Sequence, residues 1–334
     1  MPENKSIFRM FDPDAPDFKG IKTWHNSKPL SIREFHGKVV LIDFFTYSCS
    51  NCVNTFPNVR MMLDKYKDRG LVVIGVQTPE FEFEKDDANV AKALEKYGID
   101  YPVANDADNV TWRSYGGQYW PRRALVNGRG KVVFQQVGEG GEHELELKII
   151  DLLHEIGVKG EFMIEKDREL TREDRAKVAD YVKRKTPETY LGWERGRIGN
   201  GAACVPGSCS NFVDHDRHAD HEVYLSGEWV QEKESARKEG DAEGYLAIRY
   251  TARRANAVMR PYLGKRHRVH VLLDGKPLDR SNAGRDVKID QTGSFVHVER
   301  PDMYELVETE AVGTHELRLV SDSDEFCVHA LTFS

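Results

Sequence analysis

The sequence is short of cysteine, of long apolar runs and of excess positive charge. Its 334 residues include only five cysteines, too few for a secreted fold that disulfides hold together. No stretch approaches the roughly 18 consecutive apolar residues of a membrane-spanning helix. Residues 1–18 carry charges throughout, where a signal peptide has an apolar core. As written, the chain is expected to stay in the cytoplasm.

The composition is that of a soluble globular protein with a mildly acidic balance. Apolar residues make up 40% and charged residues 31% of the chain, and 48 basic against 55 acidic residues give a net charge of −7. Because nucleic acids attract basic surfaces, this balance predicts that nucleic acid is not a partner. A chain of 334 residues is longer than one hydrophobic core usually serves, so two domains are expected.

The first half of the chain alternates between strand and helix patterns. Val39–Phe45 is a mostly apolar run, as in a strand buried on both faces, and a helical pattern ending at Gly70 follows it. The alternation continues with a strand at Leu71–Val76, a helix at Asn89–Tyr97, strands at Ala124–Val126 and Lys131–Val137, and a helix at Leu145–Ile156. This order predicts an α/β domain, residues 1–158, with a mixed sheet and flanking helices.

The second half of the chain has a different sequence pattern. Residues 159–186 are highly charged, with a helical run at Arg172–Lys183, and are interpreted as a linker. From residue 187 onward, short alternating segments are separated by Gly, Asp and Asn; they are His221–Leu225, Gly244–Tyr250, Arg268–Leu273, Phe295–Val298 and His315–Val320. This spacing predicts an all-β sandwich or jelly roll over residues 187–334.

Cys49 and Cys52 form a C-x-x-C motif between a predicted buried strand and a predicted helix. The first N–H groups of a helix are unsatisfied and carry partial positive charge, so they stabilise a thiolate placed there. Cys49 is then the attacking thiol, and Cys52, one turn later, resolves the mixed disulfide. The two alternatives are half of a zinc site and a pair of core cysteines. The strand before the motif and the helix after it favour redox chemistry.

The segment VVLIDFFTYSCSNC resembles the thioredoxin superfamily, and more narrowly its TlpA/DipZ-type proteins. Further similar segments follow in the same order at residues 73–86, 101–112 and 119–133. Residues 186–192, TPETYLG, are similar to the start of the carbohydrate-binding-module-like β domain of DipZ-type proteins. The resemblance implies a thioredoxin-like fold, a redox-active disulfide and no other cofactor.

The resemblance also assigns roles to single residues. Cys49 matches the nucleophile and Cys52 the resolving cysteine. Pro121 matches the proline that follows a cis peptide bond and lies against the cysteine pair, which places the Trp120 backbone where an extended substrate chain can pair with it. The alternative for Pro121 is an ordinary trans proline at the start of a strand.

Three further positions concern proton transfer and substrate contact. Asp43 matches a buried carboxylate that accepts the proton of Cys52; a purely structural carboxylate is the alternative. Thr55 stands where many TlpA-type proteins have glutamate, which leaves Asp43 as the main candidate acceptor. Ser48 stands where thioredoxins have tryptophan, so Tyr47 is the nearest aromatic candidate for substrate binding.

Glu80 follows the second buried strand, in the segment TPEF. Strand ends in such sheets face the active site, so Glu80 is a candidate for substrate docking or proton transfer. The alternative is a solvated loop glutamate.

The second domain carries a further cluster of ligand-type residues. Cys204 and Cys209 could form a local disulfide or a second exchange pair, because the Pro-Gly between them favours a tight turn. The dense run of His and Asp that follows is interpreted as a solvated loop, and no metal is predicted. Metal binding is the less favoured alternative, and the candidate ligands for such a metal are Cys204, Cys209, His215, His218 and His221.

The leading hypothesis is a thiol–disulfide oxidoreductase, more narrowly a protein disulfide reductase, acting on disulfide-containing proteins. The resemblance implies electrons from a thioredoxin-reductase-type system or a CcdA-like membrane protein, and an extracytoplasmic location as the alternative to the cytoplasm. One rival is a peroxiredoxin-like thiol peroxidase. Another is a binding protein whose β domain holds a glycan or a protein partner, with the redox domain as an accessory.

Overall fold

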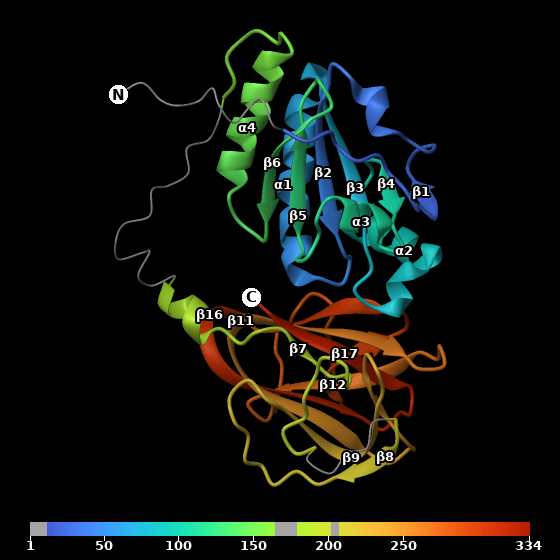
Figure 1. Ribbon diagram of the computed structural model, residues 1–334. Helices are drawn as coiled ribbons and strands as arrows, with labels where there is room; N and C mark the ends of the chain where they lie inside the picture. Colours follow the sequence, from blue (N-terminus) through green and yellow to red (C-terminus); the bar gives the residue numbers. More distant parts are fainter. Residues whose placement is uncertain (1–11, 164–178, 202–206) are drawn as a thin grey trace. The chain divides into compact units, whose positions relative to one another are not determined.

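The computed structural model describes residues 12–163, 179–201 and 207–334. The chain divides into two compact units, Met1–Glu169 and Leu170–Ser334, which Figure 1 shows in blue to green and in yellow to red. The first unit is α/β, and the second consists of β-strands after a short helical segment at residues 179–184, so the fold class inferred from the sequence is confirmed.

The predicted helical linker lies partly outside the described residues. Residues 164–178 belong to the part of the chain that is not described, whereas residues 179–184 are helical. The boundaries at residues 158 and 187 therefore remain predictions.

The first unit is built on one six-stranded sheet in the order β1-β4-β3-β2-β5-β6. Its strands are β1 (Thr23–His25), β2 (Val39–Phe45), β3 (Leu71–Gln77), β4 (Val103–Asn105), β5 (Arg122–Val126) and β6 (Val132–Val137). β2, β3 and β4 run parallel, while β1, β5 and β6 pair with their neighbours antiparallel. The sheet is therefore mixed, as predicted.

Helices cover both faces of this sheet (Figure 1). The α-helices are α1 (Ser50–Tyr66), α2 (Asp87–Tyr97), α3 (Val110–Ser114) and α4 (Glu142–Glu155); the 3-10 helices are η2 (Ile32–Phe35), η3 (Lys67–Arg69) and η4 (Glu82–Lys85). Side chains alternate along β2 because strand residues point to opposite faces. Leu41 and Phe45 pack in the core formed with α1, α2 and α4, whereas Ile42 and Phe44 pack in the core that includes α3.

The long elements of this unit agree closely with the sequence pattern, and the short ones were missed. Val39–Phe45 is the predicted strand without any shift, and α1 with η3 ends at Gly70, which takes the left-handed conformation that glycine allows. β1, β4 and α3 were not predicted. Segments of three to five residues are too short to show a period.

The second unit forms an eleven-stranded antiparallel sheet around one core. Its strands are β7 (Thr189–Tyr190), β8 (Cys209–Phe212), β9 (Val223–Gln231), β10 (Ala236–Lys238), β11 (Gly244–Pro261), β12 (His267–Leu273), β13 (Lys276–Pro277), β14 (Lys288–Asp290), β15 (Gly293–Val298), β16 (Asp302–Ser321) and β17 (Phe326–Phe333). Cys327 lies in β17 and is fully buried.

Two of these strands are much longer than the sequence indicated. The predicted segments Gly244–Tyr250 and His315–Val320 are parts of β11 and β16, which have 18 and 20 residues. β11 pairs with β9 through its first half and with β17 through its second half. Its pairing with β16 has a register shift between Ala252 and Arg254. Such irregularities bend a strand, so β11 passes from one part of the folded sheet to another.

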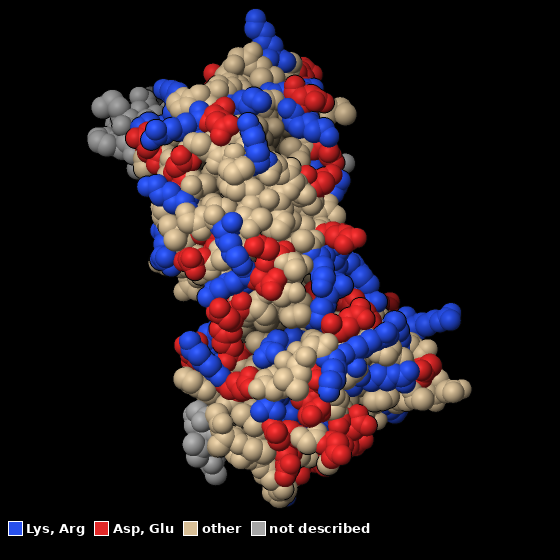
Figure 2. All heavy atoms as spheres, turned by 90° about the vertical axis from the view of Figure 1, so that its right-hand side faces the viewer, with Lys and Arg blue, Asp and Glu red and all other residues tan. Residues whose placement is uncertain are grey.

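Charged side chains of both signs are interspersed over the face that Figure 2 shows. No helix in the described part of the chain combines the length and the apolar character that a bilayer crossing requires.

Candidate active site

The two motif cysteines occupy different environments at the start of α1. Cys49 is the N-cap residue and is half-buried, whereas Cys52 lies one turn into the helix and is fully buried. Burial, and after it the hydrogen bond with the Cys49 thiol, raises the pKa of Cys52 well above its usual value. An accessible thiol at a helix N-terminus beside a buried, protonated thiol is the arrangement that stepwise disulfide exchange needs.

Asp43 lies below this pair in the middle of β2. It belongs to the same face of the strand as Leu41 and Phe45, the face that packs against α1, and it is fully buried. Burial raises the pKa of Asp43 to about 6, although the charge of Arg123 acts in the opposite direction. Asp43 is close enough to Cys52 for its charge to raise the pKa of that thiol. It can therefore exchange a proton near neutral pH.

Arg123 is a buried cation that the sequence reasoning missed. It lies directly opposite Asp43 in the antiparallel pairing of β2 with β5, and its side chain is fully buried. Its Nη2 atom donates to the carbonyl oxygen of Gly138 at 3.2 Å and lies 3.5 Å from Oε1 of Glu142. Within the described residues, neither oxygen of Asp43 accepts a hydrogen bond, so the cation acts on this carboxylate through its charge. Only the strand register brings the two residues together.

The Trp120–Pro121 peptide bond is cis, the geometry that the family resemblance implies. Pro121 is buried, and the Trp120 ring is stacked on Trp112 with 5.0 Å between ring centroids. Nε1 of Trp120 donates to the hydroxyl oxygen of Thr78 at 2.5 Å. The side chain of Trp120 is thus tied to the loop after β3, which leaves its backbone as the part that a substrate can use.

The remaining predicted contact residues lie on the loops next to the cysteines. Tyr47 is 1% exposed, so its ring belongs to the core and offers little surface to a substrate. Glu80 is half-buried, and its backbone N–H donates to Oε2 of Glu84 at 2.6 Å. Glu84 is fully buried and was not singled out from the sequence, because a charged segment such as EFEFEKD looks solvated.

Among the described residues, the candidate metal ligands Cys209, His215, His218 and His221 do not form one group. His218 lies between two carboxylates, with Nε2 2.8 Å from Asp214 and Nδ1 2.9 Å from Glu316. His221 instead contacts the hydroxyl of Thr186 at 2.7 Å. The proposed pairing of Cys209 involves Cys204, which lies outside the described residues.

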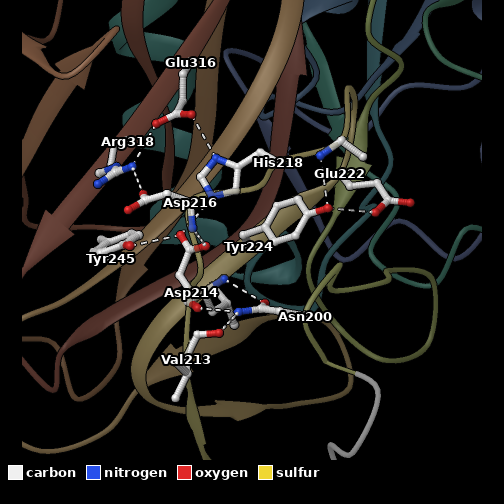
Figure 3. A network of polar contacts seen from close by, with 12 residues as sticks. Asn200, Val213, Asp214, Asp216, His218, Glu222, Tyr224, Tyr245, Glu316 and Arg318 are labelled. Carbon is white, nitrogen blue, oxygen red and sulfur yellow. Dashed lines mark hydrogen bonds and ion pairs between the residues drawn. The ribbon is translucent and has the colours of Figure 1, made fainter.

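A different trio in this region has ligand-type geometry. Ligand atoms of Asp214, Asp216 and His218 lie within 4.8 Å of one another. Each of the three also has a protein partner in Figure 3: Tyr245 donates to Asp214, Arg318 donates to Asp216, and His218 reaches Glu316. The trio is therefore an internally satisfied polar network that holds the 214–218 loop to β16.

The fold and the cysteine site define the first unit as a thioredoxin-like redox domain. The family model described as Redoxin matches residues 12–151, and the one described as Thioredoxin like C-terminal domain matches residues 186–334. The chain is a member of the thioredoxin superfamily, of the DipZ/TlpA type.

The chain is similar to curated proteins and to solved structures. Protein DipZ of Mycobacterium bovis is 36% identical over 273 residues, which cover 79% of this chain and 37% of that protein. The thiol-disulfide oxidoreductase ResA of Bacillus anthracis is 29% identical over 133 residues, covering 40% of this chain and 73% of ResA. A solution structure of a thioredoxin-like protein in the oxidised form is 27% identical, covers 43% of this chain and 97% of that one, and has a TM-score of 0.40.

The chain spans only 37% of the length of the DipZ relatives that it matches. The activity, substrates and partners of a full-length DipZ protein are therefore not assigned to this chain.

Proposed function

We propose that this protein is a thiol–disulfide oxidoreductase that reduces disulfides in protein substrates. The observation that carries the proposal is the asymmetric thiol pair: a half-buried Cys49 at the start of α1 and a buried Cys52 with a raised pKa, next to the carboxyl group of Asp43. The matches to proteins named for thiol–disulfide exchange support it.

The reaction takes place in two exchange steps. The Cys49 thiolate attacks one sulfur of the substrate disulfide, forms a mixed disulfide and releases the other sulfur as a thiolate. Cys52 then loses its proton to the carboxylate of Asp43 and attacks the sulfur of Cys49. The products are the Cys49–Cys52 disulfide and the second substrate thiol, so two electrons pass from the enzyme to the substrate. Pro121 and the Trp120 backbone guide the extended substrate chain.

The redox-active disulfide is the only cofactor that this cycle uses. The oxidised enzyme needs two electrons to return to the dithiol, from a thioredoxin-reductase-type or a CcdA-like donor. For the β unit we propose a glycan or protein ligand, and for the chain a cytoplasmic location, with an extracytoplasmic one as the alternative.

The reduction potential of the Cys49–Cys52 pair tests the direction of electron flow. The protein is equilibrated across dithiol buffers in a Cys204→Ser, Cys209→Ser background, and its free thiols are counted by alkylation and mass. We expect a potential near or below that of thioredoxin, about −270 mV. A potential near that of the oxidant DsbA, about −120 mV, would mean that the enzyme forms disulfides.

Two controls separate the proposal from its rivals. Cys49→Ser has to abolish disulfide exchange, and full activity in this variant would refute the mechanism. Rapid consumption of hydrogen peroxide with a thiol donor, without reduction of protein disulfides, would instead favour the peroxiredoxin-like alternative.

A further inference from the structure

The carboxylate of Glu84 is the most heavily hydrogen-bonded acidic group beside the cysteines. It is fully buried, although the segment of sequence around it is strongly charged. Oε1 accepts hydrogen bonds from the Thr46 hydroxyl, from the Ser48 hydroxyl at 2.7 Å and from the Ser48 backbone N–H at 3.3 Å. Oε2 accepts from the backbone N–H groups of Glu80 at 2.6 Å and Phe81 at 2.9 Å.

Glu84 accepts all five of these hydrogen bonds: three come from backbone N–H groups, which only donate, and two from hydroxyls, which can also accept. A carboxylate accepts hydrogen bonds through both oxygens, so its ionised form satisfies the whole set. An amide in the same place would direct its NH2 group at a backbone N–H, either that of Ser48 or those of Glu80 and Phe81, so at least one hydrogen bond would be lost. The ionised carboxylate thus satisfies every donor of the site, whereas burial favours the neutral form; these hydrogen bonds oppose the effect of burial, and the pKa of Glu84 is raised to about 7.

The first group of partners leads directly into the cysteine motif. Thr46 and Ser48 occupy the turn between β2 and Cys49, and the Thr46 carbonyl oxygen accepts the backbone N–H of Cys49 at 3.2 Å. The Thr46 backbone is also in hydrogen-bonding contact with the Cys52 thiol. The orientation of both cysteines at the start of α1 thus depends on a turn whose side chains are held by Glu84.

The second group of partners lies on the loop that follows β3. Glu80 and Phe81 follow Thr78, which receives the hydrogen bond from Trp120 and donates its own N–H to Phe45 at 2.8 Å. Glu84 therefore joins the cysteine turn to the loop that supports Trp120, the residue before Pro121. Ser48, which stands where thioredoxins have tryptophan, supplies two of the five hydrogen bonds.

We propose that Glu84 is a positioning residue that holds the Thr46–Ser48 turn and so sets the reactivity of Cys49. Through the same contacts, it fixes the distance between the cysteine turn and the loop after β3, which supports Trp120 next to Pro121. The inference rests on the proposed disulfide exchange, but its central measurement is the reactivity of one thiol and does not require a turnover assay.

The test compares Glu84→Gln with Glu146→Gln in the Cys204→Ser, Cys209→Ser background. Glu146 is also a buried carboxylate of the first unit, but it accepts from Tyr66 and Lys65 at the far end of α1. That helix has 17 residues, so the control lies roughly 25 Å from the motif. For each variant we would measure the rate of Cys49 alkylation across pH, the reduction potential and the thermal unfolding midpoint.

We expect Glu84→Gln to slow alkylation of Cys49 by about tenfold or more and to shift the reduction potential, because small misplacements of a reacting group have effects of this size. Glu146→Gln should lower the unfolding midpoint and leave the alkylation profile unchanged. If Glu84→Gln lowers only the unfolding midpoint, as the control does, the residue is purely structural and the proposal is wrong.

Ser48→Ala provides a second variant if Glu84→Gln does not fold. It removes one hydroxyl donor and should slow Cys49 alkylation about threefold. When both variants fold, their combination should slow alkylation no more than Glu84→Gln alone, because one interaction is lost in both. No effect of Ser48→Ala, or fully multiplicative effects, would contradict the positioning role. If alkylation depends on Glu84 but the native protein exchanges no disulfide, the proposed function fails and this inference stands.

Discussion

Two cysteines three positions apart have different surroundings, and this difference separates their roles. Cys49 caps the helix at the surface, and Cys52 is enclosed by the core between the sheet and α1. A buried thiol does not react until a mixed disulfide forms next to it, which protects the pair from unwanted oxidation before substrate arrives.

The first prediction follows from this separation. Cys52→Ala should still react through Cys49 but should accumulate the mixed disulfide with a protein substrate, because no second thiol resolves it. Intact-mass measurement under non-reducing conditions would show the adduct, and dithiothreitol would release it. The matched variant Cys49→Ser should form no adduct. An adduct of Cys49→Ser in a Cys204→Ser, Cys209→Ser background would mean that another thiol attacks.

The second prediction concerns the buried carboxyl group of Asp43. Its pKa is raised from 3.8 to about 6, so between these values the folded protein holds a proton that the unfolded chain releases. The stabilising contribution of the neutral form is complete below the unfolded pKa and is lost as pH rises through about 6. Asp43→Asn has no such titration.

From about pH 4 to about pH 7, the free energy of unfolding of Asp43→Asn should therefore rise by about 2 kcal/mol relative to that of the unmodified protein. Urea unfolding of both proteins at the two pH values measures this difference, and the titration of Glu84 cancels because both proteins contain it. A difference that does not change with pH would show that the Asp43 carboxyl titrates like an exposed one. The same variant should also resolve the mixed disulfide more slowly.

At the scale of elements, β2 carries the site because its alternating side chains serve both cores. Its neighbours provide the charge balance: β3 presents Gly75 beside Asp43, and β5 presents Arg123 on the other side. A Cβ atom at Gly75 would lie 3.0 Å from the side chains of Phe45 and Val103, so even alanine would require these side chains to shift slightly. The buried cation opposite Asp43 comes from β5.

The third prediction concerns the loop between β8 and β9. Burial lowers the pKa of His218, but hydrogen bonds to Asp214 and Glu316 outweigh this effect and raise it above 6.5. Both carboxylates only accept hydrogen bonds, so the ring donates from both nitrogens when it is charged. The stabilising contribution is present below the unfolded pKa and is lost as pH rises through the higher folded value.

His218→Gln should consequently lower the free energy of unfolding by about 2 kcal/mol near pH 6 and by much less near pH 9. Chemical unfolding followed by tryptophan fluorescence measures this difference, since Trp229 is buried in the core of the same unit. His215→Gln, in the same loop and with no such pair of carboxylates among the described contacts, is the control. An equal loss at both pH values would mean that His218 is neutral in the folded protein.

At the scale of the whole molecule, the two units do not share a core. The first unit has one core on each face of its sheet, and the one beside α1 contains Cys52, with Cys49 packed against it. The core of the second unit includes Trp229 and Phe326. A change in the redox state of the motif therefore acts first on the stability of the unit that holds it.

The fourth prediction is that the redox state moves the thermal transition of the first unit more than that of the β unit. In this size range, a stability change of about 1 kcal/mol moves Tm by about 3 °C. Calorimetry of the full chain with and without dithiothreitol, in the Cys204→Ser, Cys209→Ser background, would resolve the effect. Equal shifts of both transitions would contradict it, and so would no shift of either.

Local features of the sequence determined the core of the site. The apolar run Val39–Phe45, the C-x-x-C motif and the helical pattern after it are contiguous, so strand, thiols and helix could be placed without tertiary information. The strand period places Asp43 on the same face as Leu41 and Phe45. These assignments depend on periodicity and on helix ends, which a continuous stretch of chain displays by itself.

Tertiary structure alone decided the partners of that core. Arg123 meets Asp43 through the register of β2 with β5, and Glu84 meets Ser48 across 36 positions of sequence. It also decided the length of β11 and β16, whose bends interrupt the simple alternation on which the sequence prediction relied. From the sequence alone, a charged residue that is distant from its partners is expected to be solvated. Its burial depends on hydrogen-bond donors and counter-charges that only folding brings to it.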